Sequence, residues 1–240
     1  MNENSPIAAR YRLDPDWAWL TSPASVALDG AFTFVHRMSA TDVFRAFDID
    51  PGSARLMTAE QALGDPVLRT ASFDEGPQWI RVAESGDWTV AVEYSQQKTH
   101  VDGVASHLAR DTEVVFVAAN EGEPAVINYL SHGEYVFALE CGAPYDTRGG
   151  RRPRLFDEEM SEAGLFDFIP IMPIGDCVVA MMAILGRHLG FSLTPETVNG
   201  PLPTAYRMHL YTPPNPPLRV NPQAGAEAEQ SPKPPPSSPA

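Results

Sequence analysis

The chain has 240 residues, of which 43% are hydrophobic and 9% aromatic, proportions that are ordinary for a packed globular protein. It carries 17 Lys and Arg against 31 Asp and Glu, which gives a formal net charge of −14. That charge argues against nucleic-acid binding and against docking on an anionic membrane, because both need clustered basic side chains. A basic protein partner or a cationic ligand remains compatible with it.

The cysteines and the N-terminal sequence indicate in which cellular compartment the protein is expected. Cys141 and Cys177 are the two cysteines, and neither has the spacing of a CxxC or Cys/His metal site. Residues 1–13 contain no apolar signal region, and the longest apolar run, 177–185, is too short to span a bilayer. We therefore expect a cytoplasmic protein.

The first third of the chain mixes helices with one strand. The pattern predicts a helical turn at 14–20, a strand at 31–35 and a helix at 39–47. Thr58 and Gln61 have the spacing of a capping box and predict the start of another helix.

The middle of the chain is predicted to be β. Alternating apolar residues and turn signals indicate strands at 79–84, 87–94, 113–119, 125–130 and 135–140. A helix is expected at 101–109, between the second and third of these strands.

The last part of the domain is predicted to be a loop and helices. A Gly- and Arg-rich loop is expected at 142–153, followed by a short helix at 157–163. Asp176 is expected to cap a buried helix that Gly190 ends, and Thr194 to begin a last short helix.

About six strands joined mostly by short links predict an antiparallel meander with flanking helices, in a single α+β domain. We expect a flexible N-terminus at 1–12, the globular domain at 13–212 and a disordered proline-rich tail at 213–240. The tail has no aromatic residue and almost no aliphatic residue to bury, so its folding would not offset the loss of chain entropy.

Several segments resemble an uncharacterised family of high-GC actinobacterial proteins, a domain of unknown function. The segments are WAW at 17–19, FVHRMS at 34–39, MTAE at 57–60, GDWTVAVE at 86–93, the stretch 115–140, EAGL at 162–165 and LTPE at 193–196. Together they span most of residues 14–202. The resemblance implies no activity, because the family has no assigned reaction.

The most unusual local feature is a basic cluster in the Gly-rich loop, made of Arg148, Arg151, Arg152 and Arg154. Guanidinium groups suit phosphates and carboxylates, so one interpretation is a loop that holds an anionic ligand or an acidic partner. The alternative is neutralisation by the acidic run at 157–159 or by other surface carboxylates, as is common for exposed charges.

Three further residues are candidate contacts. Trp17 and Trp19 are two apart and would point in different directions on a helix, so they could form an aromatic binding surface or pack in the core. Arg37 precedes a helix N-terminus at Ser39, where an anion could bind; local capping and a charge pair with Asp42 form the alternative.

Glu93, His100 and His107 are candidates for an acid/base pair or a metal site. On a helix the two histidines would lie about 10 Å apart along the axis, too far for one ion. We therefore expect no metal and no cofactor, and His107 is expected on a solvated helix face.

No nucleophile elbow or phosphate-binding loop occurs in the sequence. The preferred hypothesis is a non-catalytic domain that binds another protein in a regulatory or immunity-like role. The alternative is a small-molecule-binding protein, or an enzyme, whose anionic ligand is held by the Arg148–Arg154 loop.

Overall fold

The computed structural model describes residues 16–21, 30–66, 79–93, 103–119, 124–142, 146–166 and 174–206. The chain divides into two units, Met1–His209 and Leu210–Ala240, and every described residue belongs to the first unit. The predicted flexible N-terminus at 1–12 and the predicted tail at 213–240 lie outside the described residues.

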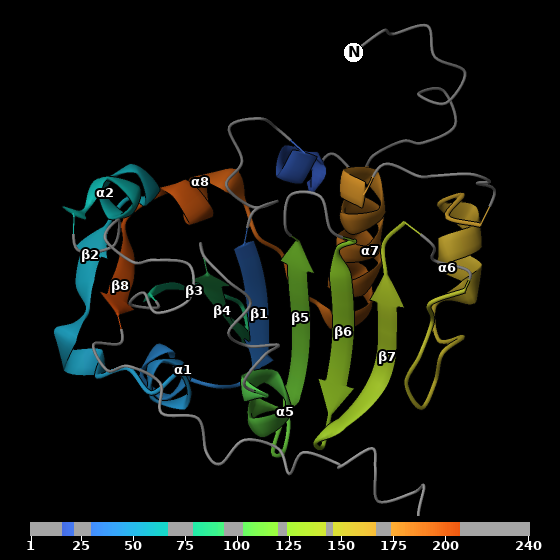
Figure 1. Cartoon of the computed structure of the whole chain (residues 1–240), viewed down its shortest axis with the longest axis horizontal. Coiled ribbons are helices and arrows are strands. Elements are labelled where there is room, and N and C mark those ends of the chain that lie inside the picture. The colour runs from blue at the N-terminus through green and yellow to red at the C-terminus, as the bar shows by residue number, and fades with distance from the viewer. Residues whose placement is uncertain are drawn as a thin grey trace, which may run out of the picture. The chain divides into compact units, whose positions relative to one another are not determined.

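An eight-stranded sheet forms the centre of the described part (Figure 1). Its spatial order is β2-β8-β3-β4-β1-β5-β6-β7, and every neighbouring pair is antiparallel. The strands are β1 (Gly30–His36), β2 (Arg55–Met57), β3 (Trp79–Ser85), β4 (Trp88–Glu93), β5 (Glu113–Ala119), β6 (Val126–Ser131), β7 (Glu134–Glu140) and β8 (Leu202–Tyr206).

The antiparallel α+β prediction is confirmed, with two strands more than expected. β2 is only three residues long, and β8 contains Pro203, which cannot donate a backbone hydrogen bond. Neither strand therefore gives a clear local signal. β8 lies between β2 and β3, and β1 lies between β4 and β5, so the order is not a simple meander.

Helices cover both faces of the sheet. They are η1 (Ala18–Thr21), α1 (Ala40–Ala46), η3 (Pro51–Ser53), α2 (Ala59–Gly64), α5 (Val104–Leu108), α6 (Asp157–Glu162), α7 (Ile174–Leu189) and α8 (Pro195–Asn199). The longest, α7, packs against η1 and α6. α1 and α5 pack against each other and belong to the second core cluster. Within the described ranges, these helices lack the length of apolar sequence that a bilayer crossing needs.

Each face of the sheet has its own core, because successive side chains of a strand point to opposite faces. Phe32 and Phe34 of β1 belong to the cluster that contains α7, and Ala31 and Val35 belong to the cluster that contains α1 and α5. Figure 1 shows α7 and α5 on opposite sides of the sheet.

Two helix boundaries differ from the sequence prediction. Asp176 lies in the first turn of α7, which begins at Ile174, so Asp176 is not its N-cap. α5 begins only after Gly103, whose left-handed φ of 69° interrupts the helix that was predicted from residue 101. At the other end of α7, Gly190 has a φ of 77°, as expected for a helix-ending glycine.

Candidate functional site

A pocket of about 490 Å³ lies beside α5. That volume is within the range of about 300–1,000 Å³ in which small molecules bind. Its lining comes from the end of α1, from α5 and its flanking residues, and from the turn between β6 and β7. The lining residues are Ala46, Gly103, Val104, Ser106, His107, Arg110 and Gly133.

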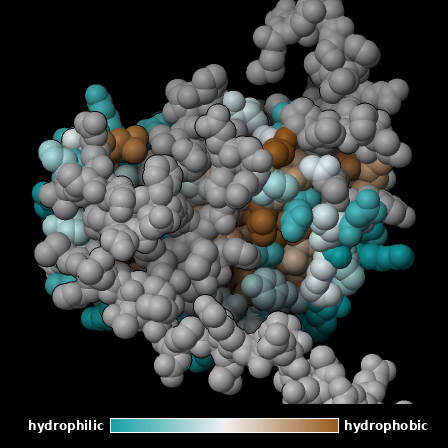
Figure 2. Space-filling model, viewed as in Figure 1, coloured by the Kyte–Doolittle hydropathy of each residue, from teal (hydrophilic) through white to brown (hydrophobic). Residues whose placement is uncertain are grey.

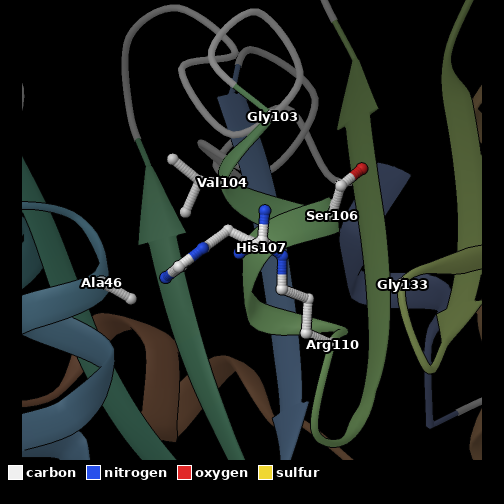
Figure 3. Close-up of a pocket in the computed structure, with 7 residues that line it drawn as sticks. All are labelled: Ala46, Gly103, Val104, Ser106, His107, Arg110 and Gly133. Carbon is white, nitrogen blue, oxygen red and sulfur yellow. The ribbon is translucent and has the colours of Figure 1, made fainter.

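The amphipathic character of α5 directs two polar side chains into this pocket. Ala105 and Leu108 are buried in the core under α5, so the opposite side of the helix faces out. His107 lies near the end of α5 and Arg110 two residues past that end, and both are exposed. Figure 3 shows the His107 side chain extending from α5 toward Ala46, and the Arg110 side chain running back along α5 toward His107.

The turn after β6 completes the pocket. The backbone N–H of Gly133 donates to the carbonyl of Ala109 at 2.8 Å, which ties the turn to the end of α5. Gly133 has a φ of 76°, and a Cβ at this position would lie 3.8 Å from Cγ of Arg110. The left-handed φ therefore favours glycine here, whereas a Cβ would make only an ordinary contact with the Arg110 side chain.

The pocket has an uncompensated positive group. The guanidinium of Arg110 is permanently cationic, and the imidazole of His107 beside it supplies a further hydrogen-bonding group. Among the residues that the structure describes, neither side chain belongs to an ion pair. An anion placed between them would meet attraction that no carboxylate of the described residues already satisfies.

The Arg148–Arg154 loop has a different environment. Arg148 is only 12% exposed, forms an ion pair with Asp157 and stacks on the ring of Phe166 at 4.9 Å. Arg151 pairs with Glu134 at 2.7 Å. Two of the four arginines therefore have carboxylate partners within the molecule.

The backbone of the same loop is attached to the sheet. The N–H groups of Arg151 and Arg152 donate to the carbonyls of Tyr135 and Val136 at 2.9 and 2.8 Å. The side chains of Arg152 and Arg154 are exposed. Ligand binding by this loop stays a prediction, and it would depend mainly on these two side chains.

The two N-terminal tryptophans have structural contacts. Trp17 is buried and packs edge-on against Phe34 and Phe191. Trp19 is half-buried, and its indole N–H donates to the carbonyl of Leu193 at 3.2 Å. Both residues thus hold η1 against the core.

Arg37 lies in a tight turn at the end of β1. It has a φ of 52°, its backbone N–H donates to the carbonyl of Asp87 at 2.7 Å, and its Nε lies 3.5 Å from an Asp87 carboxylate oxygen. Ser39 accepts a hydrogen bond from the N–H of Asp42, as the predicted cap requires. Asp42 itself pairs with Arg45, not with Arg37.

A network of polar side chains on the α7 face was not anticipated. Glu113 accepts a hydrogen bond from the Tyr129 hydroxyl at 2.5 Å, and its other oxygen lies 3.4 Å from Nδ1 of His36. The ring of His36 stacks on Trp88. Burial, and then the hydrogen bond to Glu113, raise the pKa of Tyr129. The three side chains come from three different strands, so only the sheet register could reveal their proximity.

The residues considered for metal binding do not gather in the described structure. Glu93 is buried in the sheet and accepts a hydrogen bond from Thr33, whereas His107 is exposed on α5. His100 lies outside the described residues. Within the described ranges, no group of three His, Cys, Asp or Glu side chains is arranged to hold a metal ion.

The importance of Arg110 was missed because His107 was considered only together with His100. The available signal was the three-residue spacing between His107, near the end of the helix predicted at 101–109, and Arg110, just after it. The contribution of Gly133 depends on a contact between segments that are distant in sequence, which no local pattern reports.

The central antiparallel sheet with helices on both faces defines an α+β protein. The chain belongs to a family of unknown function, DUF6461, whose model matches residues 13–170. This membership confirms the resemblance to a domain of unknown function, and the matched region includes every residue that lines the pocket. Comparison with curated proteins and with solved structures gave no match.

Proposed function

We propose that this protein binds a small molecule through an anionic group, a phosphate or a carboxylate, in the pocket beside α5. One observation carries the proposal: His107 and Arg110 project together into a pocket of about 490 Å³ and have no carboxylate partner among the described residues. The function is binding, and no chemical step is assigned to the pocket.

The chemistry of the two side chains supports an oxygen anion. The planar guanidinium of Arg110 presents a fork of N–H donors that matches the paired oxygens of a carboxylate or phosphate. The His107 imidazole adds a hydrogen-bonding group from α5, whereas Figure 3 shows the Ser106 hydroxyl directed away from both side chains. Hydrogen bonds to a charged group contribute about 1.5–3 kcal/mol each, enough for the site to select an anion over a neutral analogue.

The overall charge limits the affinity. With a net charge of −14, the chain repels anions at long range, so attraction has to come from the immediate surroundings of Arg110. At about 4 Å, two unit charges attract by about 1 kcal/mol in water and about 4 kcal/mol near a protein surface. We therefore expect the short-range contacts with Arg110, and not the net charge of the chain, to set the affinity.

A thermal-shift screen of phosphorylated and carboxylated metabolites tests the proposal. At low ionic strength, at least one anion should raise the melting temperature of the wild-type chain, and Arg110→Gln should lose about tenfold or more in affinity for it. Arg154→Gln is a matched control, because it removes an exposed arginine outside the pocket.

The double variant Arg151→Ala/Arg152→Ala separates the pocket from the basic loop. Under the proposal, this variant keeps the ligand-induced shift. If it loses the shift while Arg110→Gln keeps it, the Arg148–Arg154 loop is the anion site. If no anion stabilises the wild-type chain, the proposal is wrong.

A second candidate function is binding of another protein, in a regulatory or immunity-like role. It is favoured by Leu56 on β2, which is 71% exposed, and by Leu63 on α2, which is 41% exposed. β2 lies at the edge of the sheet, and Figure 2 shows a small hydrophobic area over α2 at the upper left among hydrophilic side chains. Exposed apolar side chains beside an edge strand of the described sheet are typical of a docking surface.

A pull-down from host lysate tests this second function. The full chain, residues 1–212 and Leu56→Glu should be compared, with Arg45→Glu as an exposed control on α1. A stoichiometric partner that is lost with Leu56→Glu supports docking at β2. A partner lost only with the truncation assigns docking to the C-terminal segment.

We also propose that the protein works in the cytoplasm. Cys141 and Cys177 are both free thiols, as expected in a reducing compartment. Cell fractionation with an antibody to the chain tests this; recovery with the secreted proteins would contradict it.

A further inference from the structure

The pocket beside α5 holds two basic side chains of different kinds. Among its described lining residues, His107 and Arg110 are the two whose side chains can carry a positive charge, and the exposed Asp111 that follows is not part of the lining. A guanidinium is always cationic in proteins, whereas an imidazole gains or loses its proton between about pH 5 and 8. Because the Arg110 side chain runs back along α5 toward His107 (Figure 3), one anionic group can contact both.

Among the described residues, the elements packed against α5 add no other charge to the lining. These elements are β5 and α1. β5 contributes Val114, Phe116 and Ala118 to the core on this face, and none of these side chains ionises. In α1, Arg45 pairs with Asp42 at 2.9 Å, and neither residue lines the pocket.

The turn between β6 and β7 brings no carboxylate to the described lining either. His132 and Glu134 flank Gly133 in this part of the chain, and neither of them lines the pocket. Glu134 pairs with Arg151 at 2.7 Å. A bound anion would therefore be the group in the pocket that favours the charged form of the His107 imidazole.

We propose that His107 makes this pocket select a phosphate monoester over a carboxylate or a phosphate diester. The inference rests on the anion-binding function proposed above. Above about pH 6 a phosphate monoester carries close to two negative charges, whereas a carboxylate or a diester carries one. Arg110 balances the first charge, and protonated His107 balances the second. Binding of the monoester thus draws a proton from solvent onto His107.

This proton uptake makes the affinity depend on pH. A doubly charged anion should bind more weakly as pH rises, because keeping the proton on His107 then costs more free energy. A monoester itself loses charge below about pH 6, so its affinity should be highest between about pH 6 and 7. Sulfate isolates the contribution of the protein, because it stays doubly charged throughout the range in which imidazole titrates.

Methyl phosphate and dimethyl phosphate are the matched probes, since they differ by one methyl group and one charge. Each is titrated into the full chain at about pH 6.5 and low ionic strength, and the amide proton–nitrogen correlation spectrum is recorded. Methyl phosphate should bind about tenfold more tightly than dimethyl phosphate. His107→Gln should remove most of this difference, whereas Arg110→Gln should weaken the binding of both esters.

Sulfate titrations at about pH 5.5 and about pH 8 test the proton uptake. The affinity of the wild-type chain should fall about tenfold over this range, and that of His107→Gln should stay constant. His132→Gln is the matched control, because it removes an exposed histidine beside the pocket that is not part of the lining. This variant should keep the wild-type pH dependence.

Equal affinities of the wild-type chain for the two esters overturn the inference, and this comparison needs no variant. A pH dependence of sulfate binding that survives in His107→Gln overturns it as well. In both cases, amide shifts at 103–110 that depend on Arg110 would leave the anion-binding proposal standing. If neither ester nor sulfate perturbs these amides, both proposals are wrong.

Discussion

Arg81 is a charged residue that the sheet buries completely. Its exposed fraction is 0%, and its guanidinium donates to the carbonyls of Val198 and Gly200 at 2.5 Å and of Met57 at 2.9 Å. These acceptors lie at the ends of α8 and β2, so one side chain joins both elements to β3. The guanidinium of Arg81 thus supplies hydrogen bonds, whereas its apolar stem is buried in the sheet.

Arg81→Met retains the stem and removes the donors. Because buried carbonyls lose their partners, the free energy of unfolding should fall by more than about 2 kcal/mol. Urea unfolding followed by circular dichroism measures this loss. Arg45→Met, which removes an exposed pair with Asp42, should change the free energy by less than about 0.5 kcal/mol. Equal effects of the two variants would contradict the assignment.

Tyr129 links stability to alkaline pH. Its folded-state pKa is raised above the ordinary value of 10.0 by burial and by the hydrogen bond to Glu113. The folded state therefore holds the phenol proton more tightly than the unfolded state. This contribution is complete below the unfolded pKa and is lost as pH rises above about 10.

Tyr129→Phe should lower the free energy of unfolding by about 1 kcal/mol near neutral pH, because the hydrogen bond to Glu113 is lost. Above about pH 10 the difference from wild type should shrink. Urea unfolding at neutral and alkaline pH measures both effects. Tyr135→Phe is the control, since Tyr135 is 43% exposed on the next strand. A difference that stays constant with pH would show that Tyr129 ionises equally in both states.

At the scale of elements, the segment around Gly150 covers the outer edge of β7. Gly149 forms a bridge with Ala138, and Gly150 has a φ of 90°. A Cβ on Gly150 would lie 2.8 Å from the carbonyl oxygen of Val136 and 3.0 Å from Cα of Phe137. Only glycine meets both the backbone angle and the close approach.

Gly150→Ala should therefore separate this segment from β7 and lower the free energy of unfolding by about 1–3 kcal/mol. Gly149→Ala is the matched control, because its Cβ would meet only the Cβ of Ala138, at 3.7 Å. Amide hydrogen exchange of β7, measured with urea unfolding, shows where the loss occurs. Equal exchange in the two variants would contradict the role given to Gly150.

Local signals made several elements predictable from the sequence. The capping box of Thr58 and Gln61 forms as expected, with both of its hydrogen bonds present. Thr194 caps α8, and its neighbour Pro195 occupies the first helical turn. In each case the residues that decide the structure lie within one turn of each other.

Long-range features could not be predicted in the same way. The pairing of β2 with β8 joins segments far apart in sequence, and the pocket needs Ala46, α5 and Gly133 together. The basic cluster at 148–154 was visible in the sequence, but the partners Asp157 and Glu134 became clear only from the fold. The sequence shows where the arginines cluster, but only the fold shows that Arg148 and Arg151 have carboxylate partners.

At the scale of the whole molecule, the account depends on a local positive site in an acidic protein. The net charge of −14 produces a negative potential around the protein that repels anions. Within the pocket, Arg110 and His107 attract an anion at short range. Added salt screens the long-range repulsion more than the contact attraction, because screening grows with distance. Affinity for an anion should therefore depend on Arg110 more than on the net charge of the chain.

The most direct measurement is a phosphate titration followed in the amide proton–nitrogen correlation spectrum of the full chain at low ionic strength. We predict that the perturbed amides cluster at 103–110, with Ala46 and Gly133, and that Arg110→Gln abolishes their shifts. Resonances of 148–154 should not move. Perturbation centred on 148–154, or no perturbation at millimolar phosphate, would contradict the claim that this protein binds anions in the pocket beside α5.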